Sequence, residues 1–146
     1  MKGNLWIAGA VFLADRGTKL LWDRIPADGK TLIPGILGLR PLRNTGMAFS
    51  LLSGAPRLTA LLSLLIVGAA FLFLRRKKLR PLAETGLMMM LGGALGNLAD
   101  RLFLGYVPDL IELLFVRFAV FNVADACLVC GCLLVILDLC RRETNG

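Results

Sequence analysis

The chain has 146 residues and contains no histidine, which narrows the chemistry that it can perform. Serine and cysteine hydrolases need a base beside the nucleophile, and histidine usually supplies it. The Ser and Cys residues of this chain have no such paired base in the sequence. Nucleophilic catalysis by a triad is therefore poorly supported, and a metal site would have to form without its commonest ligand.

The four cysteines of the chain all lie in the last apolar segment, at Cys127, Cys130, Cys132 and Cys140. On a helix, Cys127 and Cys130 share a face, whereas Cys132 does not. No histidine or second cluster completes a tetrahedral site. We expect no metal, no cofactor and no structural disulfide, because cysteine is also an ordinary small buried residue.

Long polar stretches are missing as well, and no part of the chain reads as a separate soluble domain. The hydrophobic fraction is 57%, whereas a soluble domain averages about 45–50%. Four segments, at residues 5–22, 58–74, 82–99 and 121–140, have the length of a membrane-spanning helix, which is roughly 17–25 residues. The first segment lacks a clear small-x-small cleavage site and is expected to be retained. We therefore predict one membrane domain over residues 1–146, mainly α-helical, with four transmembrane helices.

The net charge of the chain is +7. The basic residues do not gather on a soluble face, as they do in nucleic-acid-binding proteins, so we interpret their distribution as a sign of orientation in a membrane. The densest basic cluster lies in the short connection at residues 75–81. The positive-inside rule places this connection and both termini in the cytoplasm. Residues 23–57 and 101–120 are then extracytoplasmic, and the glycine, proline and alternating pattern of residues 23–57 predicts short strands.

Polar residues at the outer ends of the predicted helices are too many to be scatter, since each is costly in hydrocarbon. Asp15 and Lys19 lie one helical turn apart in the order that favours an ion pair. Asn97, Asp100 and Arg101 share a second helix face, just after Gly92-x-x-x-Gly96, a spacing that allows close helix approach. The polar residues that we expect to converge there are Asp15, Lys19, Asn44, Asn97, Asp100, Arg101, Asp109, Asn122 and Asp125.

Asp109 and Asp125 flank a short apolar connection and form the centre of this set. Two neighbouring carboxyl groups cannot both ionise easily and can share one proton. The ionised member can then activate water for attack on a peptide carbonyl, while the protonated member polarises that carbonyl. Asn44, Asn122, Arg101 and backbone amides are candidates for holding the substrate strand. The resting position of the proton belongs to the pair and is not set by the sequence.

Two other functions fit parts of the pattern. A small proton-coupled transporter would use buried acids near the middle of the membrane and would usually contain an internal repeat. In this chain the acids lie toward one surface, and we find no repeat. A structural or assembly subunit would not require either Asp109 or Asp125.

Five sequence blocks resemble the bacterial lipoprotein signal peptidases (signal peptidase II). In chain order they are residues 15–19 (DRGTK), 44–49 (NTGMAF), 92–101 (GGALGNLADR), 107–109 (VPD) and 121–125 (FNVAD). Each block is weak alone, but five in this order with four predicted spans are specific. The resemblance implies a four-helix inner-membrane aspartyl endopeptidase with a small extracytoplasmic β-rich cradle at residues 23–57.

The same resemblance implies roles for single residues. Asp109 and Asp125 would be the catalytic pair, and Asn44, Gly46, Arg101 and Asn122 the substrate-binding residues. Asp15, Lys19, Asn97 and Asp100 would support the site. The implied substrate is a diacylglyceryl-modified prolipoprotein, cut just before its lipidated cysteine, and the cyclic peptide globomycin would inhibit the reaction. We expect a monomer that also contacts membrane lipids.

The chain departs from the family's pattern in two places. Pro108 precedes the first catalytic position, where an aliphatic residue is expected, and the connection between Asp109 and Asp125 is shorter than usual. Neither departure removes a motif residue. Both affect how far residues 110–120 can extend over a substrate.

Overall fold

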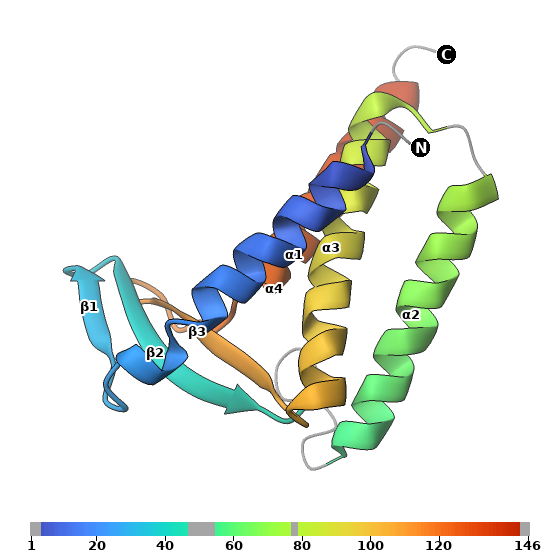
Figure 1. Ribbon diagram of the computed structural model, residues 1–146. Helices are drawn as coiled ribbons and strands as arrows, with labels where there is room; N and C mark the ends of the chain where they lie inside the picture. The colour runs from blue at the N-terminus through green and yellow to red at the C-terminus, as the bar shows by residue number, and fades with distance from the viewer. Residues whose placement is uncertain (1–3, 47–54, 77–78, 144–146) are drawn as a thin grey trace.

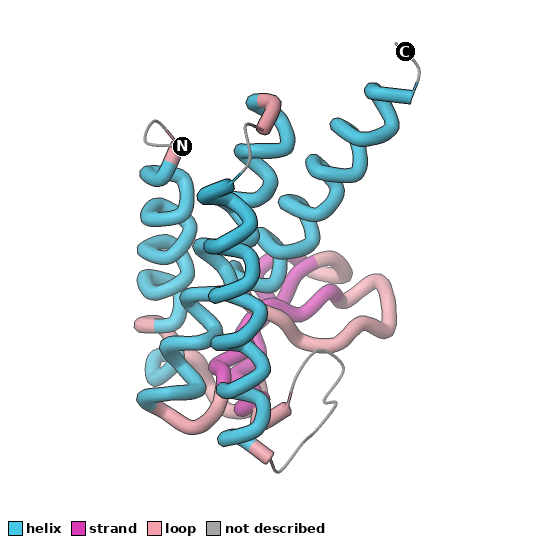
Figure 2. Tube along the Cα trace, turned by 90° about the vertical axis from the view of Figure 1, so that its right-hand side faces the viewer, coloured by secondary structure: helices cyan, strands magenta, loops and turns pink. Residues whose placement is uncertain are grey.

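The computed structural model describes residues 4–46, 55–76 and 79–143, which form four α-helices and a three-stranded sheet (Figure 1). The helices are α1 (Leu5–Lys19), α2 (Pro56–Arg76), α3 (Pro81–Phe103) and α4 (Val123–Glu143). A short 3₁₀ helix, η1 (Trp22–Arg24), follows α1, and the strands are β1 (Lys30–Ile33), β2 (Leu37–Asn44) and β3 (Val107–Leu113). The sheet lies at one end of the helices, and the N-terminal end of α1 and the C-terminal end of α4 lie toward the other end (Figures 1 and 2).

Helix α3 is the central helix, because it packs against α1, α2 and α4. Its glycines let the neighbouring backbones come close. A Cβ atom added at Gly92 would lie 2.5 Å from the carbonyl oxygen of Ala8 in α1, and one added at Gly93 would lie 2.5 Å from that of Ala124 in α4. The close approach that the glycine spacing predicts is therefore confirmed, and it involves two different partner helices.

The sheet is antiparallel throughout, in the order β1-β2-β3. A tight turn joins β1 to β2, where Gly35 has a φ of 70°. Gly105, with a φ of 77°, follows α3 and lets the chain reverse direction into β3. In the β2–β3 register Leu42 lies opposite Asp109 and Asn44 lies opposite Val107, so the end of β2 is beside the first predicted catalytic residue.

The sheet corrects one prediction. Strands were expected only within residues 23–57, but the third strand, β3, comes from the connection at 101–120. The cradle is thus built from two of the connections between helices, α1–α2 and α3–α4. The helix bounds also differ from prediction, most clearly at α3, which ends at Phe103 rather than at residue 99.

Length and apolar composition together mark one helix among the described residues as a candidate membrane span, Val123–Arg141 within α4. Residues Leu58–Ala69 are a shorter apolar stretch of α2, and α1 has 15 residues, fewer than the about 20 that a typical span requires. Two predicted features fall partly outside the described residues. These are the block at 44–49, described only to Gly46, and the basic connection at 75–81, which includes residues 77–78.

Candidate active site

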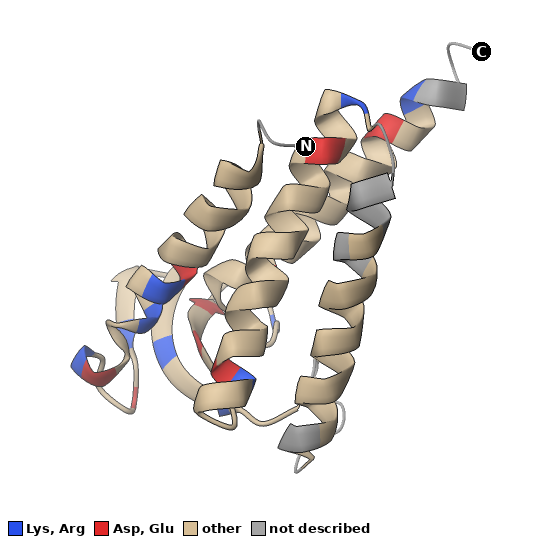
Figure 3. Cartoon of the chain, turned by 45° about the vertical axis from the view of Figure 1, so that its right-hand side comes forward, with Lys and Arg blue, Asp and Glu red and all other residues tan. Residues whose placement is uncertain are grey.

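Charged residues gather where the helices meet the sheet, while few lie in the middle of the described helices (Figure 3). Three charged residues at that end, Asp15, Asp100 and Asp109, are almost completely buried. Buried carboxylates are tolerated only when hydrogen bonds or opposite charges compensate them. The partners of these groups therefore define the site.

Asp109 lies in β3 and is 1% exposed. Its Oδ1 accepts a 2.7 Å hydrogen bond from the Asn122 side-chain amide, and its Oδ2 accepts a 3.0 Å bond from that of Asn44. Burial raises the pKa of Asp109 to about 6, and the nearby charge of Asp125 adds to this rise. The carboxyl group can therefore hold a proton near neutral pH, which an exposed aspartate does not do.

Asp125 lies in the first turn of α4 and takes part in the cap of that helix. The Asp125 N–H donates a 2.9 Å bond to Asn122 Oδ1, and the Asn122 N–H donates a 3.3 Å bond to Asp125 Oδ2. This reciprocal arrangement is a capping box, which satisfies amides that the helix itself leaves unpaired. It fixes the Asp125 carboxylate at the helix N-terminus, and the side-chain amide of Asn97 donates to its Oδ1 at 2.8 Å.

Asn122 joins the two carboxyl groups. Its side-chain NH2 donates to Asp109 Oδ1, while its backbone N–H donates to Asp125 Oδ2. The same NH2 group also donates to Asn97 Oδ1 at 3.2 Å. One buried asparagine thus links β3, α3 and α4, and it brings together two acids that are 16 positions apart in the sequence.

A second cluster lies beside this pair and is built on Lys19 of α1. The Lys19 ammonium donates to Asp15 Oδ2 and Asp100 Oδ2, each at 2.7 Å, and to Asn97 Oδ1 at 3.2 Å. Arg16 pairs with the same two acids. Asp15 Oδ1 also accepts a 3.1 Å bond from the N–H of Ala124, in the first turn of α4. The cluster has two negative and two positive charges, so it ties α1, α3 and α4 together without a net buried charge.

Arg101 connects the C-terminal end of α3 to the chain beyond β2. Its guanidinium donates to the carbonyl oxygen of Gly46 at 2.8 Å and to that of Asn97 at 3.3 Å. The Gly46 N–H in turn donates to Asn44 Oδ1 at 3.0 Å, which fixes the Asn44 amide so that its NH2 faces Asp109. Arg101 is half-buried and interacts electrostatically with both Asp109 and Asp125.

The structure brings together all the residues that the sequence placed in the site. The predicted ion pair between Asp15 and Lys19 is present. Two members of the network were missed, Arg16 and Gly96. Arg16 is adjacent to Asp15 in the sequence, but only the position of Asp100 shows that it bridges the two acids. At Gly96 an added Cβ would lie 2.7 Å from Asp15 Oδ2, so glycine leaves room for that carboxylate.

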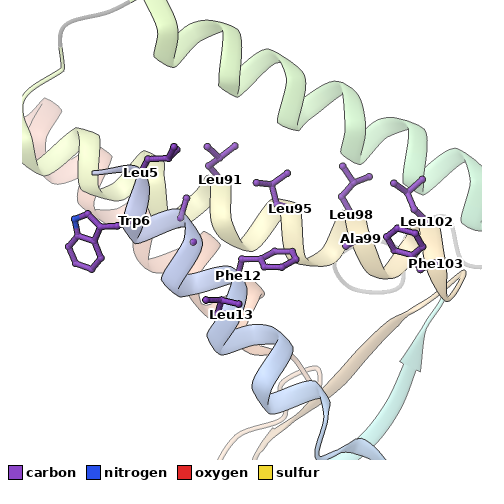
Figure 4. A pocket seen from close by; sticks show the side chains of 12 residues that line it. Leu5, Trp6, Phe12, Leu13, Leu91, Leu95, Leu98, Ala99, Leu102 and Phe103 are labelled. Carbon is purple, nitrogen blue, oxygen red and sulfur yellow. The ribbon is translucent and has the colours of Figure 1, made fainter. Parts of the chain in front are cut away.

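Within the described part of the chain, no group of three His, Cys, Asp or Glu side chains is arranged to hold a metal ion. An apolar cavity of about 810 Å³ lies between α1 and α3, lined by residues such as Phe12, Leu95 and Leu98 (Figure 4). None of the clustered acids lines this cavity. The polar residues around Asp109 and Asp125, rather than this cavity, form the candidate active site.

Comparison with known proteins identifies related sequences over most of the chain. The family described as signal peptidase (SPase) II matches residues 7–141. A lipoprotein signal peptidase of Latilactobacillus sakei subsp. sakei (strain 23K) is 41% identical over 114 residues, which are 77% of this chain and 76% of the relative. One from Lactobacillus gasseri is 38% identical over 138 residues, which are 92% of this chain and 90% of the relative.

Two solved structures of bacterial membrane enzymes, both obtained by the in meso method, share the fold. One superposes with a TM-score of 0.91 at 28% identity and covers 100% of this chain and 92% of the neighbour. The other has a TM-score of 0.84 at 28% identity, with coverages of 95% and 93%. The likeness therefore extends to the sheet as well as to the helices.

Proposed function

This chain belongs to the signal peptidase II family, and on that premise we propose that Asp109 and Asp125 are its catalytic pair. The protein is a membrane protease that removes the signal peptide from prolipoproteins, and the transporter hypothesis has no support. One observation carries the assignment of the pair: Asn122 donates to a carboxyl oxygen of each acid, at 2.7 Å and 3.3 Å. That arrangement suits two acids that work on one substrate bond.

In the proposed reaction Asp109 holds the shared proton and Asp125 is ionised. Asp109 is the more buried of the two and has a pKa of about 6. Asp125 removes a proton from water while the water oxygen bonds to the scissile carbonyl carbon, and Asp109 donates its proton to the carbonyl oxygen. When the tetrahedral intermediate collapses, the C–N bond breaks, the leaving nitrogen takes the proton that Asp125 received, and one hydroxyl of the intermediate returns its proton to Asp109, which restores the starting state of the pair.

Asn44, Gly46 and Arg101 would hold the substrate as an extended strand beside β2, and Asn122 would complete this set. Arg101 contacts the Gly46 carbonyl at 2.8 Å and interacts electrostatically with Asp109 and Asp125, which supports a further interaction with a substrate carbonyl. Asp15, Lys19, Asn97 and Asp100 would support the pair from behind. Hydrogen bonds to the two acids or to their immediate partners support these proposed roles.

The substrate that we propose is a diacylglyceryl-modified prolipoprotein, cut just before the modified cysteine, with globomycin as an inhibitor. Exposed apolar side chains support contact with lipid, because they cover the outer faces of several helices; examples are Leu13, Leu65, Ile66, Leu133 and Ile136. We propose four membrane spans in a single domain, both termini in the cytoplasm, the sheet outside and a monomeric enzyme. The start of α1 and the end of α4 lie at the opposite end of the helices from the sheet, which supports this arrangement.

The decisive experiment is cleavage of a diacylglyceryl-modified lipobox peptide by purified protein in detergent. We expect wild type to cut before the modified cysteine. Asp109→Asn and Asp125→Asn should each lower kcat/KM by at least about 10²-fold, because each removes a proton donor or acceptor from the reaction.

Asp28→Asn is the matched control, since Asp28 is exposed in the turn before β1 and the change in charge is the same. Circular dichroism and thermal unfolding would establish that all three variants are folded. Full activity in Asp109→Asn would exclude the proposed mechanism. A folded wild type that leaves the peptide intact would exclude the proposed substrate.

A further inference from the structure

The positive charge of Lys19 is compensated entirely by groups of the protein, although Lys19 lies in a predominantly apolar helix. Its side chain is 5% exposed, and the ammonium has three acceptors, Asp15, Asp100 and Asn97. An ammonium group has three N–H donors, so none is left for substrate or water. Lys19 therefore cannot act as a binding residue, and any influence on the reaction must pass through its partners.

Asn97 is the partner that leads to the reaction centre. Its Oδ1 accepts bonds from the Lys19 ammonium and from the Asn122 amide, both at 3.2 Å. A reversed Asn97 amide would point its NH2 at these two donors, so only one orientation is compatible with the surroundings. In that orientation the NH2 group donates to Asp125 Oδ1 at 2.8 Å. The cation on α1 thus determines which end of Asn97 faces the acid on α4.

The charges around the pair come from two other elements. Arg101 and Asp100 lie on α3, and Asp15, Arg16 and Lys19 lie on α1. Lys19 lowers the pKa of Asp109 and so opposes the rise that burial and Asp125 cause. Without Lys19, the cluster of Asp15, Asp100 and Arg16 would have one net negative charge next to the two catalytic carboxyl groups.

We propose that Lys19 is a positioning residue that sets the pH range of catalysis, through its charge and through the orientation that it imposes on Asn97. This inference rests on the proposed roles of Asp109 and Asp125. A single proton on the pair is required for the reaction, so activity should fall on both sides of an optimum. Removal of the positive charge makes each proton harder to lose, which moves both limbs of the profile to higher pH.

The test measures kcat/KM against pH for four proteins: wild type, Lys19→Met, Asp15→Asn and the double variant Lys19→Met/Asp15→Asn. Lys19→Met should move the profile up by about one pH unit, as expected for a nearby charge. Asp15→Asn removes a negative charge and should move it down. The double variant restores the net charge, and its profile should lie near that of wild type. Lys30→Met, an exposed lysine in β1, is the control that should not move it.

A merely structural role for Lys19 would lower activity without these opposite movements, and that result would overturn the proposal. If Lys19→Met does not fold, the pH profile of the double variant can be compared with that of Asp15→Asn. The profile of the double variant should lie at higher pH, because the two proteins differ only by the loss of the Lys19 charge. An infrared titration of the Asp109 carboxyl in the same proteins separates this inference from the proposed function. The midpoint should rise in Lys19→Met even if the peptide is not a substrate, and an unchanged midpoint would refute the inference.

Discussion

At the scale of single residues, the choice of asparagine around the two acids has a chemical reason. Asn44, Asn97 and Asn122 each donate to a carboxyl oxygen of Asp109 or Asp125. An amide satisfies a buried carboxyl oxygen without adding a full positive charge, whereas direct contact with Arg or Lys would hold the acid ionised. Within the described residues, Lys19 and Arg101, the cations nearest the pair, form no hydrogen bond to either acid. Lys19 instead donates to the Asn97 side chain, and Arg101 donates to the Asn97 backbone carbonyl. The pair can therefore exchange a proton.

The pKa of Asp109 provides a direct check of this description. Two causes raise it to about 6, burial first and the charge of Asp125 second. Asp125→Asn removes the second cause and leaves the first. We therefore expect the Asp109 pKa to fall below about 6 but to stay above the ordinary value for aspartate, about 3.9. An infrared or ¹³C NMR titration of labelled aspartate would measure it, with the signal assigned by its loss in Asp109→Asn.

Glu112→Gln is the control for this titration. Glu112 lies on the same strand, β3, but it pairs at the surface with Arg40 at 3.2 Å. Removal of its charge should leave the Asp109 midpoint where it was. A midpoint that fails to move in Asp125→Asn would mean that the two acids do not influence one another, and the shared proton would be excluded.

At the scale of secondary-structure elements, the site depends on how closely α3 approaches α4. The N-terminus of α4 presents Asp125 toward β3 and receives the Asp15 carboxylate at the Ala124 N–H. Gly93 lies against the carbonyl of Ala124 in that same turn. Any side chain at position 93 must push this turn away from α3, and the capping box moves with it.

Gly93→Ala should therefore destabilise the protein and reduce activity together. The added methyl group would meet the Ala124 carbonyl oxygen at 2.5 Å, and such overpacking costs about 1–3 kcal/mol. Gly68→Ala in α2 is the matched control, since nothing lies within 4 Å of its added Cβ. It should raise stability slightly, because alanine favours the helix more than glycine does. Thermal unfolding in detergent would measure both, and equal midpoints would refute the packing argument.

Helices were largely predictable from the sequence because long apolar segments have few alternatives. Strand β3 was not. The sequence of Val107–Leu113 does not alternate strictly between polar and apolar residues, and in the structure its first four residues are all buried. Pro108 within this segment also argues against a central strand. Residues of the site could be named from polar positions in apolar surroundings, but not their partners. The pairing of Asn44 with Asp109 depends on the β2–β3 register, and the Ala124 N–H that binds Asp15 has no side-chain signature.

At the scale of the whole molecule, the two ends have different chemical character. The end with the sheet holds the buried acids Asp15, Asp100 and Asp109 together with Lys19 and Arg101, while many exposed apolar side chains lie on the helices. A protease that acts on a membrane-anchored signal peptide needs its acids near the surface of the bilayer, where water is available for hydrolysis. Its helices must at the same time face lipid. This division of the molecule follows from that requirement.

The proposed orientation can be tested by labelling introduced cysteines in a background where Cys127, Cys130, Cys132 and Cys140 are replaced by serine. Asp28 lies in the turn before β1 and Arg80 lies just before α3, and both are exposed. With the sheet outside and the α2–α3 connection inside, a membrane-impermeant maleimide should label Asp28→Cys in intact cells. It should label Arg80→Cys only after the membrane is opened. The reverse pattern would place the acids on the cytoplasmic side, where a lipoprotein precursor exported across the membrane could not meet them.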